Sequence, residues 1–335
     1  MRKNLLTLVL MTLTAVSIWA QQPARARTTA TQARTTDIFA FVPQSDGIVV
    51  VDVDRLLNET LPRVFAGDTA KLAQINSEID KFKTQTGIDA RTFNRVVVAA
   101  RYTYPSANVT KLEPVAIAQG KFDVKALALG ARLAAKGNVR EEKYHGATIT
   151  ILTINDQIKL FGLWNMRVSD LALTALNSNT VAVGTPATVR ATIDAARTPR
   201  RDSTEIVSLA TRDPQAVIGF GANVPTALLA NLNLGSDATA QDANSIRQAY
   251  GSLGTTATDV SLTLVARTET PAAAKNLGDT LTGLKQLAGF MIMQMTGDKK
   301  ALAQSALENL KINARGNEIE IRTQVAAANL ASLMK

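Results

Sequence analysis

The chain has 335 residues, 46% of them hydrophobic and 19% charged, and this length exceeds what one hydrophobic core usually serves, so two domains are expected. It contains no cysteine, which excludes disulfides, thiolate metal sites and cysteine nucleophiles and leaves buried apolar area to hold each domain together. The net charge of +9 is weak evidence for nucleic-acid binding. Residues 1–36 hold five basic and no acidic side chains, and the basic and acidic side chains of residues 37–335 are nearly equal in number. Aromatic residues, which would stack on bases, make up only 4% of the chain.

Residues 1–20 have the pattern of a secretory signal peptide. Arg2 and Lys3 precede a mostly apolar run from Leu5 to Ile18, and Ala20 is a small residue at the expected cleavage point. The apolar run falls short of the ~20 residues that a spanning helix needs, which disfavours the alternative of an uncleaved anchor. We therefore expect a periplasmic or secreted protein with no transmembrane helix after cleavage.

Residues 21–36 are predicted to form a flexible basic linker. They read QQPARARTTATQARTT and contain no apolar side chain larger than alanine. Such a segment cannot bury enough surface to offset the entropy lost on ordering. Its three arginines have the charge to touch an anionic surface, although a solvated tail is the simpler interpretation.

The first folded module is predicted over residues 37–198. A β-branched run at Ile48–Val53 indicates a buried strand, and Asp54 is placed as the N-cap of the following helix. The further elements predicted are a helix at 69–85, strands at 95–101 and 114–120, a helix at 124–135, a hairpin of 147–154 and 157–163 turning at Asn155-Asp156, strands at 171–176 and 180–183, and a helix from Pro186 to 196 with Thr185 as its N-cap.

The second module is predicted over residues 199–335, after the boundary sequence TPRRD at 198–202. Its predicted elements are a strand at 216–220, a helix entered through Pro225, a helix at 240–253, a strand at 259–267, a long helix opened by Thr270-Pro271, a hairpin of 310–314 and 318–323, and a helix to Met334. The element order and the similar runs at 96–101 and 261–267 indicate two divergent copies of one α+β module. Each copy is expected to be a mainly antiparallel sheet with helices packed on one face.

Five stretches carry a family resemblance: IVVVDVDRLL at 48–57, TGID at 86–89, AQGKFD at 118–123, KYHG at 143–146 and TVAVGTPATVRATID at 180–194. In these stretches the chain resembles exported bacterial cell-envelope proteins of unassigned activity that are built from tandem α+β modules. The resemblance covers most of residues 37–197 and, more loosely, 203–335. It implies export and the tandem architecture, and it supplies no catalytic or binding residues.

Motifs with a defined chemistry are missing from the chain. His145 is the only histidine, which excludes paired-histidine metal and acid–base sites, and no serine lies in a G-x-S-x-G elbow. His145 is therefore interpreted as a strand-edge or surface residue. Gly219-Phe220-Gly221 lacks the third glycine of a dinucleotide fingerprint and indicates close packing instead. We predict no catalytic, cofactor-binding or metal-binding residues and no cofactor.

Two local patterns have both a metal and a structural interpretation. Asp52-Val53-Asp54 places two carboxylates on one face of a strand, as a divalent cation would require, but a strand end followed by a helix cap is simpler. Met291, Met293 and Met295 have the thioethers that bind Cu(I). Because Met293 lies about 200° around a helix from Met291, these sulfurs are not expected to converge.

The helix at 271–295 carries an apolar heptad seam. The seam consists of Leu277, Leu281, Leu284, Ala288, Met291 and Met295. Further apolar residues lie off the seam, so the helix is either buried on several sides, which we favour, or presents a surface to an envelope protein partner.

The leading functional hypothesis is an exported, non-enzymatic binding or interaction protein of the bacterial envelope. The alternative is a carboxylate-dependent envelope hydrolase that acts on polysaccharide through Asp52 and Asp54 or Glu141 and Glu142. Only two tryptophans are present to stack on sugars. The discriminating feature is whether two carboxyl groups face each other across a pocket ~5–9 Å wide.

Overall fold

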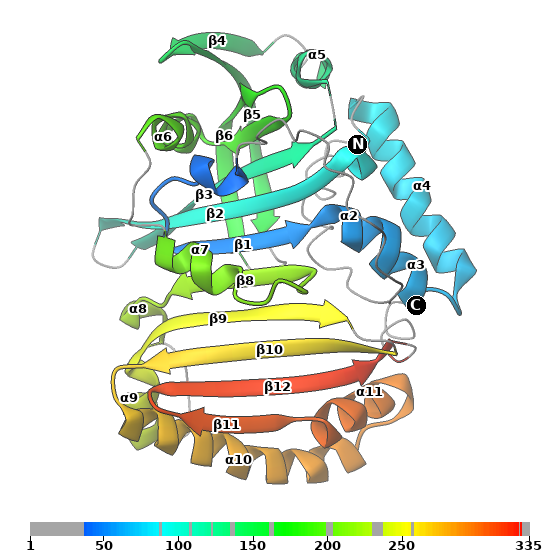
Figure 1. Ribbon diagram of the computed structural model, residues 1–335, viewed down its shortest axis with the longest axis vertical. Coiled ribbons are helices and arrows are strands. Elements are labelled where there is room, and N and C mark those ends of the chain that lie inside the picture. Colours follow the sequence, from blue (N-terminus) through cyan, green and yellow to red (C-terminus); the bar gives the residue numbers. More distant parts are fainter. Residues whose placement is uncertain are drawn as a thin grey trace, which may run out of the picture.

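The computed structural model describes residues 37–86, 89–106, 109–121, 123–134, 138–160, 164–198, 204–229, 237–255, 258–327 and 329. The expected signal peptide and linker at 1–36 lie outside the described residues, as does nearly all of the helix expected to reach Met334. Within the described part, twelve strands form a single sheet in which every neighbouring pair is antiparallel (Figure 1). The α+β fold class with an antiparallel sheet is therefore confirmed.

The strand order across the sheet is β11-β12-β10-β9-β8-β1-β2-β3-β7-β6-β5-β4. The strands are β1 (Gly47–Asp52), β2 (Phe93–Ser106), β3 (Val109–Gly120), β4 (Val139–Tyr144), β5 (Ala147–Leu160), β6 (Trp164–Asn177), β7 (Thr180–Gly184), β8 (Ile218–Asn223), β9 (Ile246–Thr255), β10 (Asp259–Thr268), β11 (Lys311–Arg315) and β12 (Glu318–Ala326).

The helical elements lie before and between these strands in the chain. They are η1 (Ile38–Phe41), α2 (Val53–Arg55), η2 (Leu56–Thr60), α3 (Leu61–Val64), α4 (Thr69–Thr86), η3 (Ala90–Thr92), α5 (Val124–Ala134), α6 (Pro186–Arg197), α7 (Thr204–Ala210), α8 (Thr226–Leu229), α9 (Asp237–Asn244), α10 (Pro271–Met293) and α11 (Gly297–Glu308). Thr185 and Thr270 cap α6 and α10 as predicted, each with proline at the start of the helix.

Helices cover both faces of the sheet, and the expectation of one covered face in each module is wrong. Ile48 of β1 packs in a cluster with residues of η1 and α7, whereas Val51 packs with residues of α2 and α3 on the opposite side. In the second half, Val265 of β10 packs against α7, while its neighbour Ala266 packs in a cluster with α10. The reason is that the central strands are apolar on both sides, so both sides require cover.

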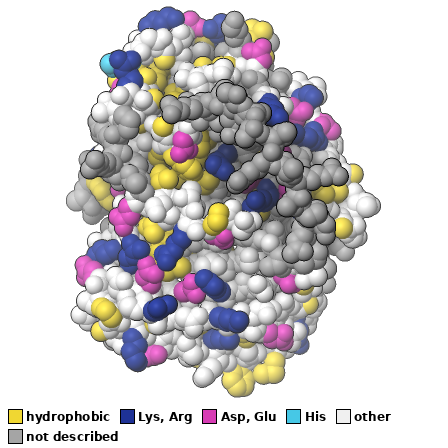
Figure 2. Space-filling model, in the orientation of Figure 1, with side chains coloured by type: hydrophobic (Ala, Val, Ile, Leu, Met, Phe, Trp, Pro, Cys, Tyr) yellow, Lys and Arg dark blue, Asp and Glu magenta, His cyan; other side chains and the backbone are white. Residues whose placement is uncertain are grey.

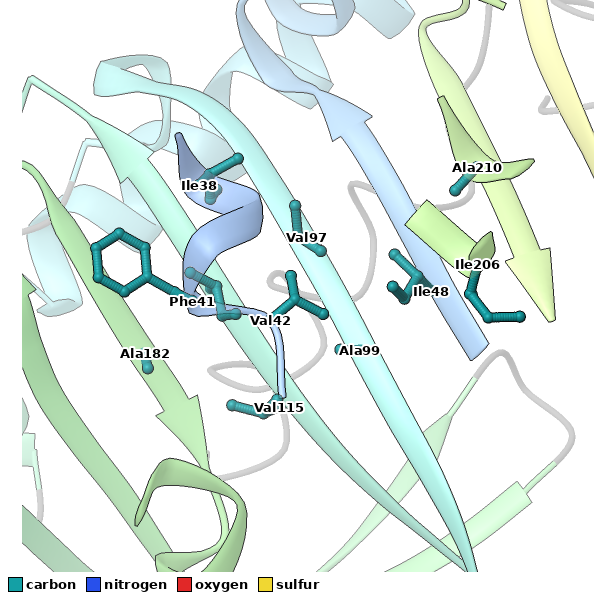
Figure 3. Packing of buried hydrophobic residues seen from close by; sticks show 11 residues of the cluster. Ile38, Phe41, Val42, Ile48, Val97, Ala99, Val115, Ala182, Ile206 and Ala210 are labelled. Atoms are coloured by element: carbon teal, nitrogen blue, oxygen red, sulfur yellow. The ribbon is translucent and has the colours of Figure 1, made fainter. Parts of the chain in front are cut away.

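We call the side covered by η1, α6 and α7 the α7 face, and the opposite side the α10 face. Figure 1 shows η1 and α7 in front of the strands, so the α7 face is turned toward the viewer. Figure 3 shows how Ile38, Phe41 and Val42 pack over Val97 and Val115 of the adjacent strands β2 and β3. This packing holds the chain segment before β1 against the sheet.

The two halves of the sheet have the same strand order when they are read outward from the β1–β8 contact. The first half runs β1, β2, β3, β7 and β6, and the second runs β8, β9, β10, β12 and β11, while β5 and β4 extend only the first half. The strands that contain the similar runs 96–101 and 261–267 do not hold matching places. These strands are β2, which is second from the β1–β8 contact in its half, and β10, which is third in its half. By position β2 therefore corresponds to β9, and β10 corresponds to β3.

Two predicted elements are wrong. Residues 147–154 and the described part of 157–163 do not form a hairpin, because β5 continues to Leu160 with a register irregularity between Thr153 and Asp156. The helix predicted at 240–253 is instead the end of α9 followed by β9. The sheet also contains β4, which the sequence did not indicate, while the hairpin of β11 and β12 is confirmed.

Candidate binding site

Residues 42–46 join η1 to β1 and form a wall between two hollows on the α7 face. The hydroxyl of Ser45 donates to the carbonyl oxygen of Pro43 at 2.8 Å. The backbone of Asp46 continues the sheet, because its N–H donates to Ala100 and its carbonyl accepts from Asn223. The wall is thus fixed by backbone hydrogen bonds on both sides.

The inner hollow lies between this wall, strands β2 and β3, and helix α6. It has a volume of about 240 Å³. Small apolar side chains line most of it, and Arg101, Glu113 and Asp194 supply its charges. No aromatic side chain is among its lining residues.

The outer hollow lies on the other side of the wall, between the end of β2 and the ends of β8 and β9. Its volume is about 630 Å³. The two hollows share Gln44, Ser45 and Arg101. Polar side chains dominate the remainder of the outer lining, which includes Asp46, Tyr102, Tyr104, Asn223, Arg247 and Gln248.

Arg101 is the guanidinium exposed to both hollows, and it forms no ion pair or hydrogen bond with a described residue. Its cross-strand neighbour Glu113 pairs instead with Lys111 at 3.0 Å. Arg247 in the outer hollow pairs with Glu269 at 2.6 Å. The site therefore contains one exposed cation, Arg101, with which no described side chain forms an ion pair.

Asp194 is held at the edge of the inner hollow by the hairpin turn between β4 and β5. The hydroxyl of Tyr144 donates to Oδ2 of Asp194 at 2.9 Å, and this hydrogen bond raises the pKa of Tyr144. His145 lies in the turn with a φ of 48°, and its Nε2 is 3.6 Å from Oδ1 of Asp194. The exposed position of His145 agrees with the surface interpretation.

A row of hydrogen-bonded side chains extends from the outer hollow across the second half of the α7 face. Gln248 donates to Asn223 at 3.2 Å, and Arg267 donates to Gln248 at 2.6 Å and to Glu318 at 2.9 Å. Burial acts to raise the pKa of Glu318, but its hydrogen bonds with Arg267 and Tyr250 hold that pKa below its usual value. Figure 2 shows basic and acidic side chains interspersed over the part of the surface where β9 to β12 lie.

Asp52 and Asp54 each accept a hydrogen bond from within their own helical segment. Asp52, rather than Asp54, is the N-cap of α2, and its Oδ1 accepts the backbone N–H of Arg55 at 3.0 Å. Asp54 accepts instead from the side chain of Asn58 at 2.7 Å. The cap falls two residues earlier than expected because β1 ends at Asp52 and the helix begins at once.

Replacing Asp52 with alanine is expected to lower the free energy of unfolding by about 1 kcal/mol, because the first turn of α2 loses its cap. The exposed Asp54→Ala variant is the matched control and should change it by less than about 0.5 kcal/mol. Urea denaturation measures both values. A heat of Mn²⁺ binding that is present in the unmodified protein and lost in Asp52→Asn would contradict the structural role.

The other predicted acidic pair also fails to converge. Glu141 and Glu142 are adjacent on β4, so their side chains point to opposite faces. Glu141 binds Arg132, and Glu142 binds Arg190 through two hydrogen bonds of 2.7 and 2.5 Å. Across the described ranges no group of three or more His, Asp or Glu side chains is placed to hold a metal ion.

The apolar helix α10 is buried along one side of its first part, and in its second half Ile292 is buried while most of the large apolar side chains are exposed. Leu277 is buried on the α10 face, whereas Leu284 and Leu287 are exposed, and Phe290 and Met291 are 66% and 71% exposed. Met293 and Met295 are also exposed. The expectation of burial on several sides is therefore wrong for the second half of this helix. In the described part of the chain, no helix combines the length and hydropathy needed to cross a bilayer.

The expected packing role of Gly219 and Gly221 is confirmed. A Cβ atom at Gly219 would overlap the carbonyl oxygen of Ala210, and one at Gly221 would lie 2.8 Å from the carbonyl oxygen of Ile206. Both contacts are with α7, which lies directly on β8. The sequence carried no comparable signal for Arg101 or for the wall at 42–46, since neither belongs to a motif.

No family model matches this chain, and no curated protein matches it. Three solved structures, entitled crystal forms III, I and IV of TP0453, are similar to it with 11%, 12% and 13% sequence identity. They cover 90%, 90% and 89% of this chain and 99%, 98% and 96% of their own, with TM-scores of 0.46, 0.43 and 0.43.

Proposed function

We propose that this protein is an exported, non-enzymatic binding protein of the bacterial envelope, periplasmic or secreted, and that the two hollows around Arg101 form its binding site. The observation that carries the proposal is the guanidinium of Arg101, which is exposed to both hollows and forms no ion pair with a described side chain. The outer hollow, at about 630 Å³, lies within the range of about 300–1,000 Å³ that is typical of small-molecule sites, and the inner hollow, at about 240 Å³, lies just below it. A guanidinium in such a place is suited to a carboxylate or another planar anion.

The alternative function, a hydrolase that uses two carboxyl groups, finds its best support in Glu113 and Asp194. Both line the inner hollow, whereas Asp52, Asp54, Glu141 and Glu142 do not. The hydrolase requires one carboxyl group to give a proton and the other to act as base or nucleophile. Here Asp194 accepts from Tyr144 and Glu113 is paired with Lys111. The hollow also lacks an aromatic platform for a sugar, so binding ranks above hydrolysis.

The duplicated architecture belongs to the same proposal. We infer that residues 37–198 and 199–335 are two divergent copies of one module, and the equal strand order of the two halves supports this. The hairpin of β4 and β5 would then be an addition to the first copy. The added hairpin places Tyr144 beside Asp194, so only the first half has this contact at the site.

The helix predicted at 271–295 is proposed as a second contact surface, toward an envelope protein. Its exposed residues Leu284, Leu287, Phe290 and Met291 support this, because soluble monomers seldom expose large contiguous apolar patches.

Co-purification tests the binding function. The full chain, expressed with its leader and recovered from the envelope fraction, is expected to carry a small molecule that denaturation releases and mass spectrometry detects. Arg101→Gln should lose at least about 90% of this ligand, which corresponds to 1.4 kcal/mol of affinity. Arg95→Gln is the matched control, since Arg95 lies on the same strand and lines neither hollow. Release of sugar from envelope polysaccharide, abolished by Glu113→Gln and Asp194→Asn, would instead establish the hydrolase.

A further inference from the structure

Arg101 and Asp194 line the same inner hollow with opposite charges, yet no ion pair joins them. Two unlike charges that share a hollow without meeting leave a place for a ligand that carries both charges. We propose that the inner hollow binds a small zwitterion of the amino-acid or short-peptide type, with its carboxylate at Arg101 and its ammonium group at Asp194. This inference rests on the proposed binding function and names its ligand class.

The carboxylate end is assigned to Arg101 because a guanidinium matches a carboxylate in shape and because no described acidic side chain pairs with it. A guanidinium presents parallel N–H donors that match the two oxygens of a carboxylate. Arg101 pairs in register with Glu113 of β3, and its neighbours Ala100 and Tyr102 are both hydrogen-bonded to Asp46, so its backbone is fixed before a ligand arrives. The acid nearest in register, Glu113, already binds Lys111.

The ammonium end is assigned to Asp194 by its remaining acceptor capacity. Tyr144 occupies Oδ2, while Oδ1 has His145 at 3.6 Å, which is beyond hydrogen-bond distance. A carboxylate oxygen accepts more than one hydrogen bond, and an ammonium group brings three donors. The bond from Tyr144 also fixes the direction of the carboxylate.

The remaining lining selects for a small ligand with both charges. An anion without an ammonium group would meet Glu113 and Asp194, and a cation without a carboxylate would meet Arg101, so either would face a like charge. One side of the inner hollow is an apolar strip of α6 with alanine at every fourth position, namely Ala187, Ala191 and Ala195. This strip of alanines leaves room for the small apolar side chains of a ligand.

Calorimetric titration of the full chain with three matched probes tests the proposal. The probes are alanyl-alanine, N-acetyl-alanyl-alanine, which lacks the ammonium group, and alanyl-alanine amide, which lacks the carboxylate. Alanyl-alanine is expected to bind at least about tenfold more tightly than either of the others. Arg101→Gln should weaken alanyl-alanine and the acetylated probe but leave the amide unchanged. Asp194→Asn should weaken alanyl-alanine and the amide but leave the acetylated probe unchanged. Arg95→Gln should leave all three affinities unchanged.

Equal affinity for the three probes overturns the inference, and so does the absence of alanyl-alanine binding with a Kd below about 10 mM. These comparisons use the unmodified protein, so they hold even if Asp194→Asn disturbs the fold through the lost bond from Tyr144. If the dipeptide fails while an Arg101-dependent ligand still co-purifies, the zwitterion is wrong and the binding function stands. If no ligand of any kind depends on Arg101, both fail.

Discussion

Replacement of Gly219 with alanine is expected to lower the free energy of unfolding by about 3 kcal/mol. The added methyl group would overlap the carbonyl oxygen of Ala210 in α7, and backbone cannot rotate away as a flexible side chain can. The helix must then move off β8, which opens the cluster in which Ile206 and Ala210 pack with Ile48. Overpacking of this kind costs about 1–3 kcal/mol, and here it acts on a central strand.

Gly283→Ala is the matched control for this experiment. Gly283 lies within α10, and a Cβ atom there would meet no heavy atom within 4 Å. The same chemical change should therefore raise the free energy of unfolding by about 0.5–1 kcal/mol through helix propensity. Denaturation in urea measures both variants. A neutral result for Gly219→Ala would mean that α7 does not lie flush on β8.

Elements with strong local signals could be predicted from the sequence. Threonine followed by proline marks the starts of α6 and α10, because the hydroxyl caps the helix and proline suits its first turn. The hairpin of β11 and β12 turns at Gly316, which has a φ of 58°. Each of these signals acts over a few residues, so no knowledge of the rest of the fold is needed.

The error in β9 shows where local reasoning ends. Ile246, Tyr250 and Leu253 recur at intervals of four and three, which is the spacing of a helix face. In the fold this segment is a strand between β8 and β10, and its partners decide its conformation. Gly251 and Gly254, which are costly inside a helix, were the available warning.

The candidate site could not be predicted for a related reason. Its wall at 42–46, Arg101 on β2 and Asp194 on α6 come from three distant parts of the chain. They meet because η1 packs over β2 and β3 and because α6 returns to the same face. In the sequence Arg101 is only the last residue of a predicted strand, and its lack of a partner among the described residues is visible only in the fold.

The fragments 37–198 and 199–335 are not expected to fold separately, even though the sequence suggests a boundary between them. Strand β1 of the first half pairs with β8 of the second, and one apolar cluster contains Val51 and Leu56 together with Val217 and Val260. Exposure of one large apolar side chain costs about 1.5–3 kcal/mol. Several such losses, with the loss of the β1–β8 pairing, are comparable to the 5–15 kcal/mol that stabilises a typical protein.

An experiment can show whether the covalent link between the halves or the contact between them is needed for stability. A protease site inserted at 199–203 of the full chain allows the two halves to be cut apart after folding. The cut halves should elute together and unfold in one transition, because pairing across β1 and β8 does not require the covalent link. Each half expressed alone should show little cooperative unfolding by circular dichroism. A cooperative transition in isolated 37–198 would show instead that the shared cluster and the hydrogen bond from Asn223 to Asp46 are dispensable for the folding of the first half.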